Sequence, residues 1–276
     1  MAGPQDLVDL DRYPIDRPES AEGAALVARL RRDLDETALA LLPGFLRPEA
    51  VAGMAAEASA LAPGAHYRDK LRTPYGWMDN AGFPEDHPRR ALHKNRGGTL
   101  TRDMFAEAGP ILSLYLWDPL TELVRRALGF EALFRSDDRW LSLEVHVEGE
   151  GDQLAWHYDT NDGVVSLLLQ EPDRGGRFEY VPFIRDEEDE NYAEVARVFS
   201  GTSTLVRQPP MAAGTFVLFR GRRSLHHVSP VGRTAKPRLI ALFSYDRRPG
   251  MVFPEATVRS VIGPAFEAHT GSPAAA

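Results

Sequence analysis

A histidine and an aspartate two residues apart form the most informative segment of the chain, Trp156-His157-Tyr158-Asp159. The segment lies where a strand pattern ends in the turn-type residues 160–163. Because successive side chains of a strand point to opposite faces, His157 and Asp159 are expected to share one face and Tyr158 to point away. The pair can therefore supply one imidazole and one carboxylate to a single metal ion.

A third ligand is available downstream, in the segment His226-His227-Val228-Ser229-Pro230-Val231, which follows a second strand pattern. Two imidazoles and one carboxylate on one face of an octahedral ion are typical of non-haem iron(II) oxygenases. Three coordination positions stay open, enough for a bidentate 2-oxo acid and dioxygen together. His226 and His227 lie on opposite faces of a strand, so only one of them can be the ligand.

A 2-oxo acid with a second carboxylate needs a cation at its far end, and an arginine can bind a carboxylate through two parallel hydrogen bonds. Arg238 opens the apolar strand pattern of residues 239–245, where a charge requires a partner. Arg233 is the alternative. If Arg238 has no functional role, it is a surface arginine at the end of a strand.

Taken together, His157-Tyr158-Asp159, Leu225–Val231 and Arg238 resemble the His-x-Asp…His…Arg signature of the iron(II)- and 2-oxoglutarate-dependent oxygenases, over about residues 139–247. The resemblance favours His226 over His227 as the metal ligand. It implies that His157, Asp159 and His226 bind Fe(II), that Arg238 binds 2-oxoglutarate, and that O2 is the second co-substrate. Succinate and CO2 would be the co-products.

Two shorter segments, 175–180 and 219–222, resemble bacterial members that hydroxylate or halogenate free amino acids. Halogenases similar to this group have a small residue where this chain has Asp159, and a halide takes the free coordination position. The resemblance therefore implies hydroxylation, or desaturation or ring closure, of an amino-acid-like small molecule.

The patterns around these residues predict a mainly β fold with a helical N-terminal layer, either a β-sandwich or a jelly-roll barrel. From these patterns together with the resemblance, we expect the jelly-roll (double-stranded β-helix, cupin-like) barrel. Helices are expected at 24–42 and 48–61 and, interrupted by Pro110 and Pro119, across 101–128, whereas 65–100 shows neither period. Strands are expected at 140–148, 153–159, 163–170, 176–183, 204–208, 214–220, 224–231 and 237–246.

We expect one oxygenase domain over 23–269, with a helical support layer (23–135) and a jelly-roll core (136–250), between an irregular arm (1–22) and a disordered tail (270–276). Residues 184–203 form an acidic insertion that is either a solvated face or a lid over the barrel. The residues proposed to contact the substrate are Glu144, Asn161, Asp162 and Trp77, with Tyr75 and Asn80 as further candidates. For each, capping a turn or packing on the body is an equally good interpretation.

Composition and charge exclude several classes of partner and of site. The net charge of −8 argues against a nucleic-acid partner, and the absence of cysteine excludes thiolate sites and disulfides. Because residues 1–19 lack a signal pattern and no apolar run is long enough to span a membrane, a cytoplasmic location is expected. Two other functions remain open: a metal-binding sensor or structural module without turnover, and a metal-dependent enzyme that does not use 2-oxoglutarate.

Overall fold

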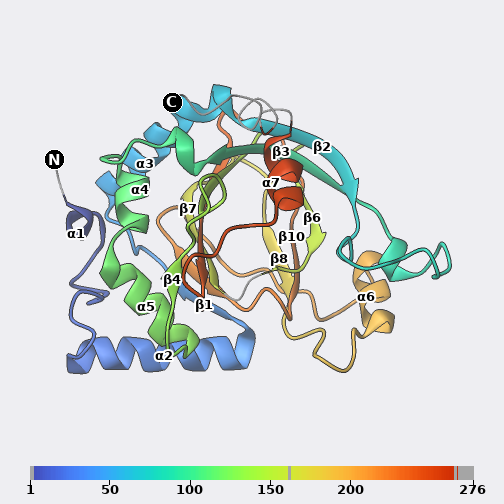
Figure 1. Cartoon of the computed structure of the whole chain (residues 1–276), viewed down its shortest axis with the longest axis horizontal. Helices are drawn as coiled ribbons and strands as arrows, with labels where there is room; N and C mark the ends of the chain where they lie inside the picture. Colours follow the sequence, from blue (N-terminus) through green and yellow to red (C-terminus); the bar gives the residue numbers. More distant parts are fainter. Residues whose placement is uncertain (1–2, 161–162, 264–265, 267–276) are drawn as a thin grey trace.

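In a computed structural model of the chain, which describes residues 3–160, 163–263 and 266, two antiparallel sheets face each other and helices cover one side (Figure 1). The larger sheet has the order β1 (Leu39–Leu42), β9 (Phe216–Phe219), β7 (Gly163–Gln170), β11 (Arg238–Asp246), β5 (Leu143–Glu148), β3 (His93–Thr101) and β2 (His66–Arg72), and β4 (Phe134–Arg135) pairs with β11. The smaller sheet has the order β6 (Leu154–His157), β10 (Leu225–Val228) and β8 (Phe178–Val181). This arrangement confirms the predicted jelly-roll class.

The helical layer is formed largely by the first half of the chain. Its helices are α1 (Pro4–Leu7), α2 (Ala21–Thr37), α3 (Pro48–Leu61), α4 (Pro110–Tyr115) and α5 (Asp118–Leu128), with short 3-10 turns η1 (Ala62–Gly64), η2 (Pro88–Arg90) and η3 (Arg102–Met104). Two helices occur later, α6 (Tyr192–Phe199) and α7 (Glu255–Ile262). None of the described helices is both long and apolar enough to cross a membrane.

Alternation along β11 explains how the larger sheet can serve the core and the site at once. Leu239, Ala241 and Phe243 are fully buried in the main core, which they share with residues of α2 to α5. Arg238 and Ile240 belong to the opposite face and line a pocket between the sheets. The outer face of the sheet therefore contributes core packing and the inner face contributes chemistry.

Four sequence predictions were wrong. Residues 101–109, the first part of the helical stretch expected at 101–128, contain the end of β3 and the 3-10 turn η3, and α4 begins only at Pro110. The helix expected at 24–42 ends at Thr37, because Ala38 adopts a left-handed conformation, and residues 39–42 form β1. Residues 65–100, expected to be irregular, contain the long strands β2 and β3, paired from His66↔Thr99 to Arg72↔His93. Residues 204–208 form no described strand and make only the single bridge Tyr180↔Arg207.

The N-terminal segment packs on the body, since Val8, Tyr13 and Ile15 are buried in the main core. The expected tail, 270–276, lies outside the described residues.

Candidate metal and co-substrate site

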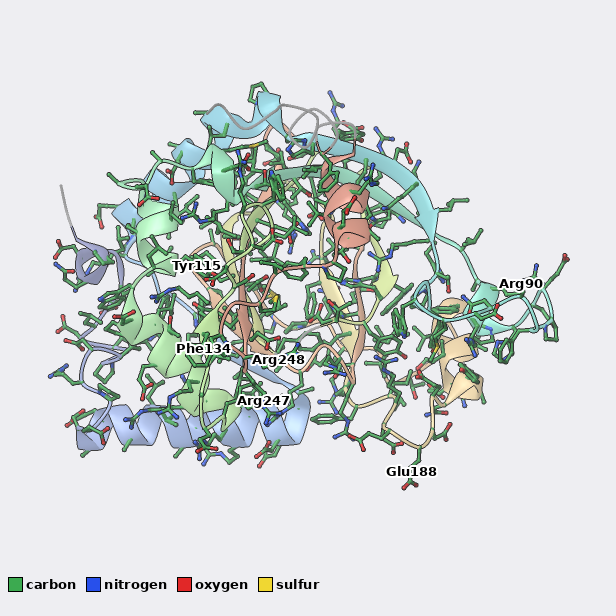
Figure 2. All side chains as sticks on the ribbon, in the orientation of Figure 1. Arg90, Tyr115, Phe134, Glu188, Arg247 and Arg248 are labelled. Atoms are coloured by element: carbon green, nitrogen blue, oxygen red, sulfur yellow. The ribbon has the colours of Figure 1, made fainter. Side chains whose placement is uncertain are left out.

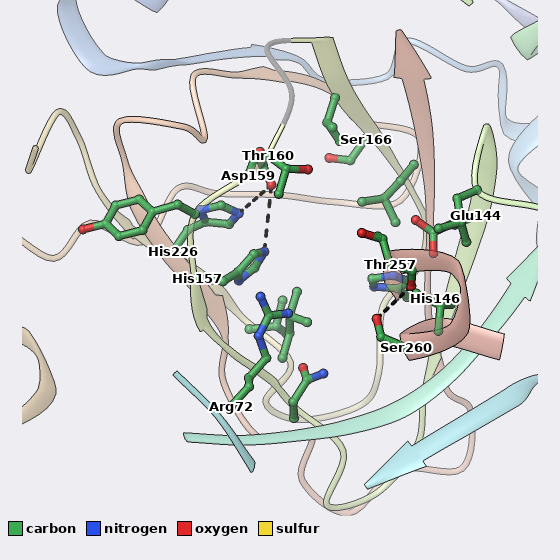
Figure 3. Close-up of a pocket in the computed structure, with 18 of the residues that line it drawn as sticks. Arg72, Glu144, His146, His157, Asp159, Thr160, Ser166, His226, Thr257 and Ser260 are labelled. Atoms are coloured by element: carbon green, nitrogen blue, oxygen red, sulfur yellow. Dashed lines mark hydrogen bonds and ion pairs between the residues drawn. The ribbon is translucent and has the colours of Figure 1, made fainter. Parts of the chain in front are cut away.

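The structure brings His157, Asp159 and His226 together on adjacent strands. His157 ends β6 and pairs directly with His226 of β10, and Asp159 follows two residues after His157. The three ligand atoms all lie within 4.8 Å of one another. Nε2 of His226 is 3.4 Å and Nε2 of His157 is 3.9 Å from Oδ1 of Asp159, as Figure 3 shows. One ion can therefore contact all three side chains.

Both imidazoles are oriented by backbone carbonyls. Nδ1 of His157 lies 2.8 Å from the Ala155 carbonyl oxygen, and Nδ1 of His226 lies 2.9 Å from that of Ser224. Because a carbonyl oxygen only accepts, each Nδ1 carries the proton and each Nε2 lone pair faces Asp159. Burial, followed by the nearby His226, lowers the pKa of His157 well below its usual value, which keeps the ring neutral as a ligand must be. The donor set fits a divalent iron ion.

His227 lies on the other face of β10. Its ring stacks on Trp156, with centroids 3.8 Å apart, and its Nε2 is 2.9 Å from Oε2 of Glu179. The structure thus brings His226, and not His227, to His157 and Asp159.

Asp159 occupies a space that exists because residue 221 is glycine. The Asp159 N–H donates to the Gly221 carbonyl oxygen at 3.2 Å. A methyl group placed on Gly221 would lie 1.8 Å from Oδ2 of Asp159, closer than any non-bonded contact allows. The sequence analysis did not identify Gly221, because its role depends on a contact between distant segments.

Arg238 is buried and lines the pocket, whereas the alternative, Arg233, is exposed and does not. Nη1 of Arg238 donates to Oε2 of Glu148 at 2.7 Å, and both side chains are only 3% exposed. The two residues are also direct cross-strand partners. The partner that a buried arginine requires is therefore an acidic residue of the protein itself.

The pocket between the sheets has a volume of about 780 Å³ and is closed on one side by α7. Of the proposed substrate residues, Glu144 and Trp77 line it, and Asn161 and Asp162 lie outside the described residues. Burial raises the pKa of Glu144 to about 7, although nearby Arg68 opposes the shift.

The further candidates Tyr75 and Asn80 have structural contacts instead. Tyr75 is fully buried against Tyr158, and the Asn80 side chain donates to the Tyr75 carbonyl oxygen. Neither lines the pocket.

Three further residues that line the pocket were not predicted from the sequence, namely the basic residues Arg68, Lys70 and Arg72 of β2. Their spacing of two puts them on one strand face, and that spacing was the available signal. Figure 3 shows Arg72 beside His157. The buried His146 of β5 was missed as well.

No described residue of 184–203 lines the pocket. Helix α6 instead packs its buried Val195 and Val198 in a separate cluster that includes Tyr75 and Tyr158. Residues 186–189 are exposed, and Glu188 projects outward in Figure 2, whereas Glu190 is partly buried and pairs with Arg185.

Comparison with known proteins gives the family. Residues 22–251 match the family model described as Halogenase D (HalD). No curated protein matches the chain.

Several solved structures share the fold. The epimerase SnoN from nogalamycin biosynthesis, in complex with Fe3+, alpha ketoglutarate and nogalamycin RO, is 18% identical, with a TM-score of 0.54 and coverage of 87% of this chain and 92% of that one. AviO1 from Streptomyces viridochromogenes Tue57 is 17% identical, with a TM-score of 0.53 and coverage of 84% and 97%. EctD from S. alaskensis, with 2-oxoglutarate and 5-hydroxyectoine, is 19% identical, with a TM-score of 0.50 and coverage of 79% and 75%.

The match to the family model covers most of the sequence, and the structural matches agree with the two-sheet architecture. The chain belongs to the Halogenase D family and has the fold of the iron(II)- and 2-oxoglutarate-dependent oxygenases.

Proposed function

We propose that this protein is an iron(II)- and 2-oxoglutarate-dependent dioxygenase that hydroxylates an unactivated C–H bond of a free amino acid or another small natural-product precursor. The observation that carries the proposal is the position of the Asp159 carboxylate, within 3.4 Å and 3.9 Å of the two imidazole Nε2 atoms. A third protein ligand of this kind leaves exchangeable positions for co-substrates and none reserved for a halide.

Each residue of the site has a distinct task in this proposal. His157, Asp159 and His226 would hold the metal, and the Ala155 and Ser224 carbonyls fix both rings in the tautomer that presents Nε2. Arg238, held by Glu148, would bind the distal carboxylate of 2-oxoglutarate. When bound, iron and 2-oxoglutarate would activate O2 for C–H cleavage, so that one oxygen atom enters the product and the other enters succinate as CO2 is released. The enclosing sheets and α7 orient the substrate and limit access of water.

A small substrate is supported by the pocket and by the relatives. The cavity of about 780 Å³ is large enough for a co-substrate and a small molecule together. The solved relatives were crystallised with nogalamycin RO and with 5-hydroxyectoine, which are small molecules.

Halogenation is the second candidate, because the matching family is described as Halogenase D. The two outcomes differ in the group that reaches the product carbon. Asp159 favours hydroxylation, since it fills the position that a halide needs, and Gly221 provides the space for its carboxylate.

Anaerobic titration of the purified protein with Fe(II) and 2-oxoglutarate is the first test. We expect a weak visible charge-transfer absorption from the chelated co-substrate, and we expect it to be lost in the Asp159→Ala and Arg238→Met variants. Iron binding without this absorption in the wild type would favour a metal enzyme that does not use 2-oxoglutarate, or a module without turnover.

The second test separates the two oxygenase outcomes. Amino acids are supplied with Fe(II), 2-oxoglutarate, O2 and sodium chloride, and succinate and product mass are measured. We expect the product to gain one oxygen atom, with one succinate formed for each product. A chlorinated product from the wild-type protein would overturn the assignment of hydroxylation.

A further inference from the structure

Four residues form a row across the inner side of the larger sheet. Arg68 of β2 pairs with Gly97 of β3, and Glu148 of β5 pairs with Arg238 of β11. The row is continuous, because Gly98 pairs with Val147 and a methyl group on Gly97 would lie 3.5 Å from Cγ of Glu148. Two arginines therefore flank one glutamate along a single line.

Gly97 leaves the space between Arg68 and Glu148 open. Neighbouring strands lie about 4.8 Å apart, so Arg68 and Glu148 stand about two strand spacings from each other, with no side chain between them. A long arginine side chain can extend over Gly97 into this gap. Any residue larger than glycine would fill the space and contact Glu148.

Arg68 has a buried nitrogen without a partner. Its Nη1 atom makes no hydrogen bond within the described part of the chain, although it is inaccessible to solvent. No ion pair within 4.0 Å joins Arg68 to Glu148 or Glu144. An unsatisfied buried cationic donor that faces a pocket indicates a missing anionic ligand.

The charges of the row lead to the same conclusion. Arg238 and Glu148 form a buried pair whose net charge is zero. A carboxylate that approached this pair alone would meet one cation and one anion, and a buried charge without a net counter-charge is strongly disfavoured. With Arg68 counted, the three charged residues of the row carry a net charge of +1, which matches one carboxylate. Glu144, which lies outside the row, is a second acidic neighbour of Arg68.

We propose that Arg68 is a second residue that binds the distal carboxylate of 2-oxoglutarate, together with Arg238, and that Gly97 is the opening through which it reaches. This inference rests on the proposed function. Glu148 is a positioning residue in this arrangement, because it holds Arg238 and attracts Arg68. It does not contact the co-substrate, whose carboxylate has the same negative charge.

The test compares two ligands in Arg68→Met, which keeps a long unbranched stem but removes the guanidinium and its charge. 2-Oxoglutarate and 2-oxopentanoate both chelate iron, but only 2-oxoglutarate has a distal carboxylate. We expect Arg68→Met to raise the Kd of 2-oxoglutarate about tenfold or more, and to leave that of 2-oxopentanoate within threefold of the wild type. Anaerobic calorimetry on the Fe(II)-loaded protein gives both constants.

Lys70→Met is the matched control. Lys70 is the next residue on the same face of β2, it also lines the pocket, and its Nζ atom donates to the Ser260 carbonyl oxygen. The substitution removes the same charge outside the row, so the Kd of 2-oxoglutarate is expected to stay within threefold of the wild type. Arg68→Lys, which keeps the charge, is expected to bind more tightly than Arg68→Met and guards against a folding defect in that variant.

The outcomes separate this inference from the function. If the wild type binds 2-oxoglutarate and both Arg68 variants bind it as tightly as the wild type, the role of Arg68 is refuted and the proposed function stands. An equal loss for both ligands in Arg68→Met, or the same loss in Lys70→Met, also refutes a contact with the distal carboxylate. A wild-type protein that binds no 2-oxoglutarate overturns the function and this inference together.

Discussion

The contacts of Asp159 allow its role to be tested by a single substitution. Asp159→Gly removes the carboxylate that lies beside both imidazoles and leaves a small residue at that position. We expect hydroxylation to fall at least 100-fold and Fe(II) affinity to fall at least tenfold, because one of three ligands is lost. Succinate release and metal binding measure the two effects.

His227→Ala serves as the comparison for that variant. His227 contacts Trp156 and Glu179 on the opposite face of its strand, so less than a tenfold loss of activity is expected. Wild-type hydroxylation in Asp159→Gly, or a greater loss in His227→Ala, would show that the ligands were assigned incorrectly.

Gly221 can be tested through the carboxylate that it accommodates. Gly221→Ala would place a methyl group against Oδ2 of Asp159, so the carboxylate must move away from the imidazoles. We expect weaker Fe(II) binding with little change in the secondary structure, measured by metal titration and circular dichroism. Gly53→Ala is the control, because its methyl group would enter open space on α3. Equal Fe(II) affinity in both variants would contradict the proposed contact.

Glu144 makes stability depend on pH in a defined direction. Burial raises its pKa from 4.5 to about 7, so the folded state favours the protonated form. Its contribution is therefore fully present below pH 4.5 and is lost as the pH rises through 7. Because the side chain borders a pocket that water can enter, the effect is about 1–2 kcal/mol.

Urea unfolding of wild type and Glu144→Gln at pH 5 and pH 8 measures this contribution. The variant should gain free energy of unfolding relative to the wild type between the two pH values. A difference that stays constant from pH 5 to pH 8 would show that Glu144 titrates normally in the folded protein.

At the scale of elements, a strand could be predicted from the sequence where its own residues show a clear alternation. His157, Asp159 and His226 could be placed on one site because two strands with alternating faces carry them. Strand β2 could not be predicted in this way. Its residues Arg68, Lys70 and Arg72 face inward and Asp69 faces the other side, and a strand with polar residues on both faces shows no hydrophobic alternation.

The same limit applied to the contacts between elements. The pairing of Arg238 with Glu148 joins two strands that are far apart in the chain, so neither residue alone indicates it. The end of α2 was missed because Ala38, and not glycine, adopts the left-handed conformation there.

The acidic segment before α6 offers a prediction about this element. Glu187 and Glu188 are exposed and do not line the pocket, so replacing both with glutamine should leave the KM for substrate unchanged. Steady-state succinate release gives this value. A KM that changed more than threefold would support a lid that closes over the barrel.

Glu190 differs from its neighbours and provides the contrast. Its carboxylate pairs with Arg185 at 3.2 Å, and the Arg185 guanidinium lies 3.7 Å from the centre of the Tyr158 ring. Glu190→Gln should therefore lower the free energy of unfolding by about 1 kcal/mol. Thermal unfolding of the two acidic variants distinguishes a structural carboxylate from solvated ones.

At the scale of the whole molecule, the site draws its residues from both sheets. His157 and His226 belong to the smaller sheet, and Arg238 and Arg68 belong to the larger one. The net charge of the chain is −8, yet the wall formed by β2 is basic. A co-substrate chelated to the metal and bound by Arg238 and Arg68 would connect the sheets, so ligand binding should be a property of the assembled barrel.

Stability should therefore rise with metal and co-substrate together. A ligand present at 100 times its Kd stabilises the folded state by about 2.7 kcal/mol. For a chain of this size we expect Tm to rise by roughly 5 °C or more with anaerobic Fe(II) and 2-oxoglutarate, measured by calorimetry. Because the co-substrate chelates the metal, 2-oxoglutarate alone should raise Tm much less. An equal rise without metal would mean that 2-oxoglutarate binds away from the metal site and does not connect the two sheets. An equal rise in Asp159→Gly would mean that the Asp159 carboxylate is not needed to hold the metal.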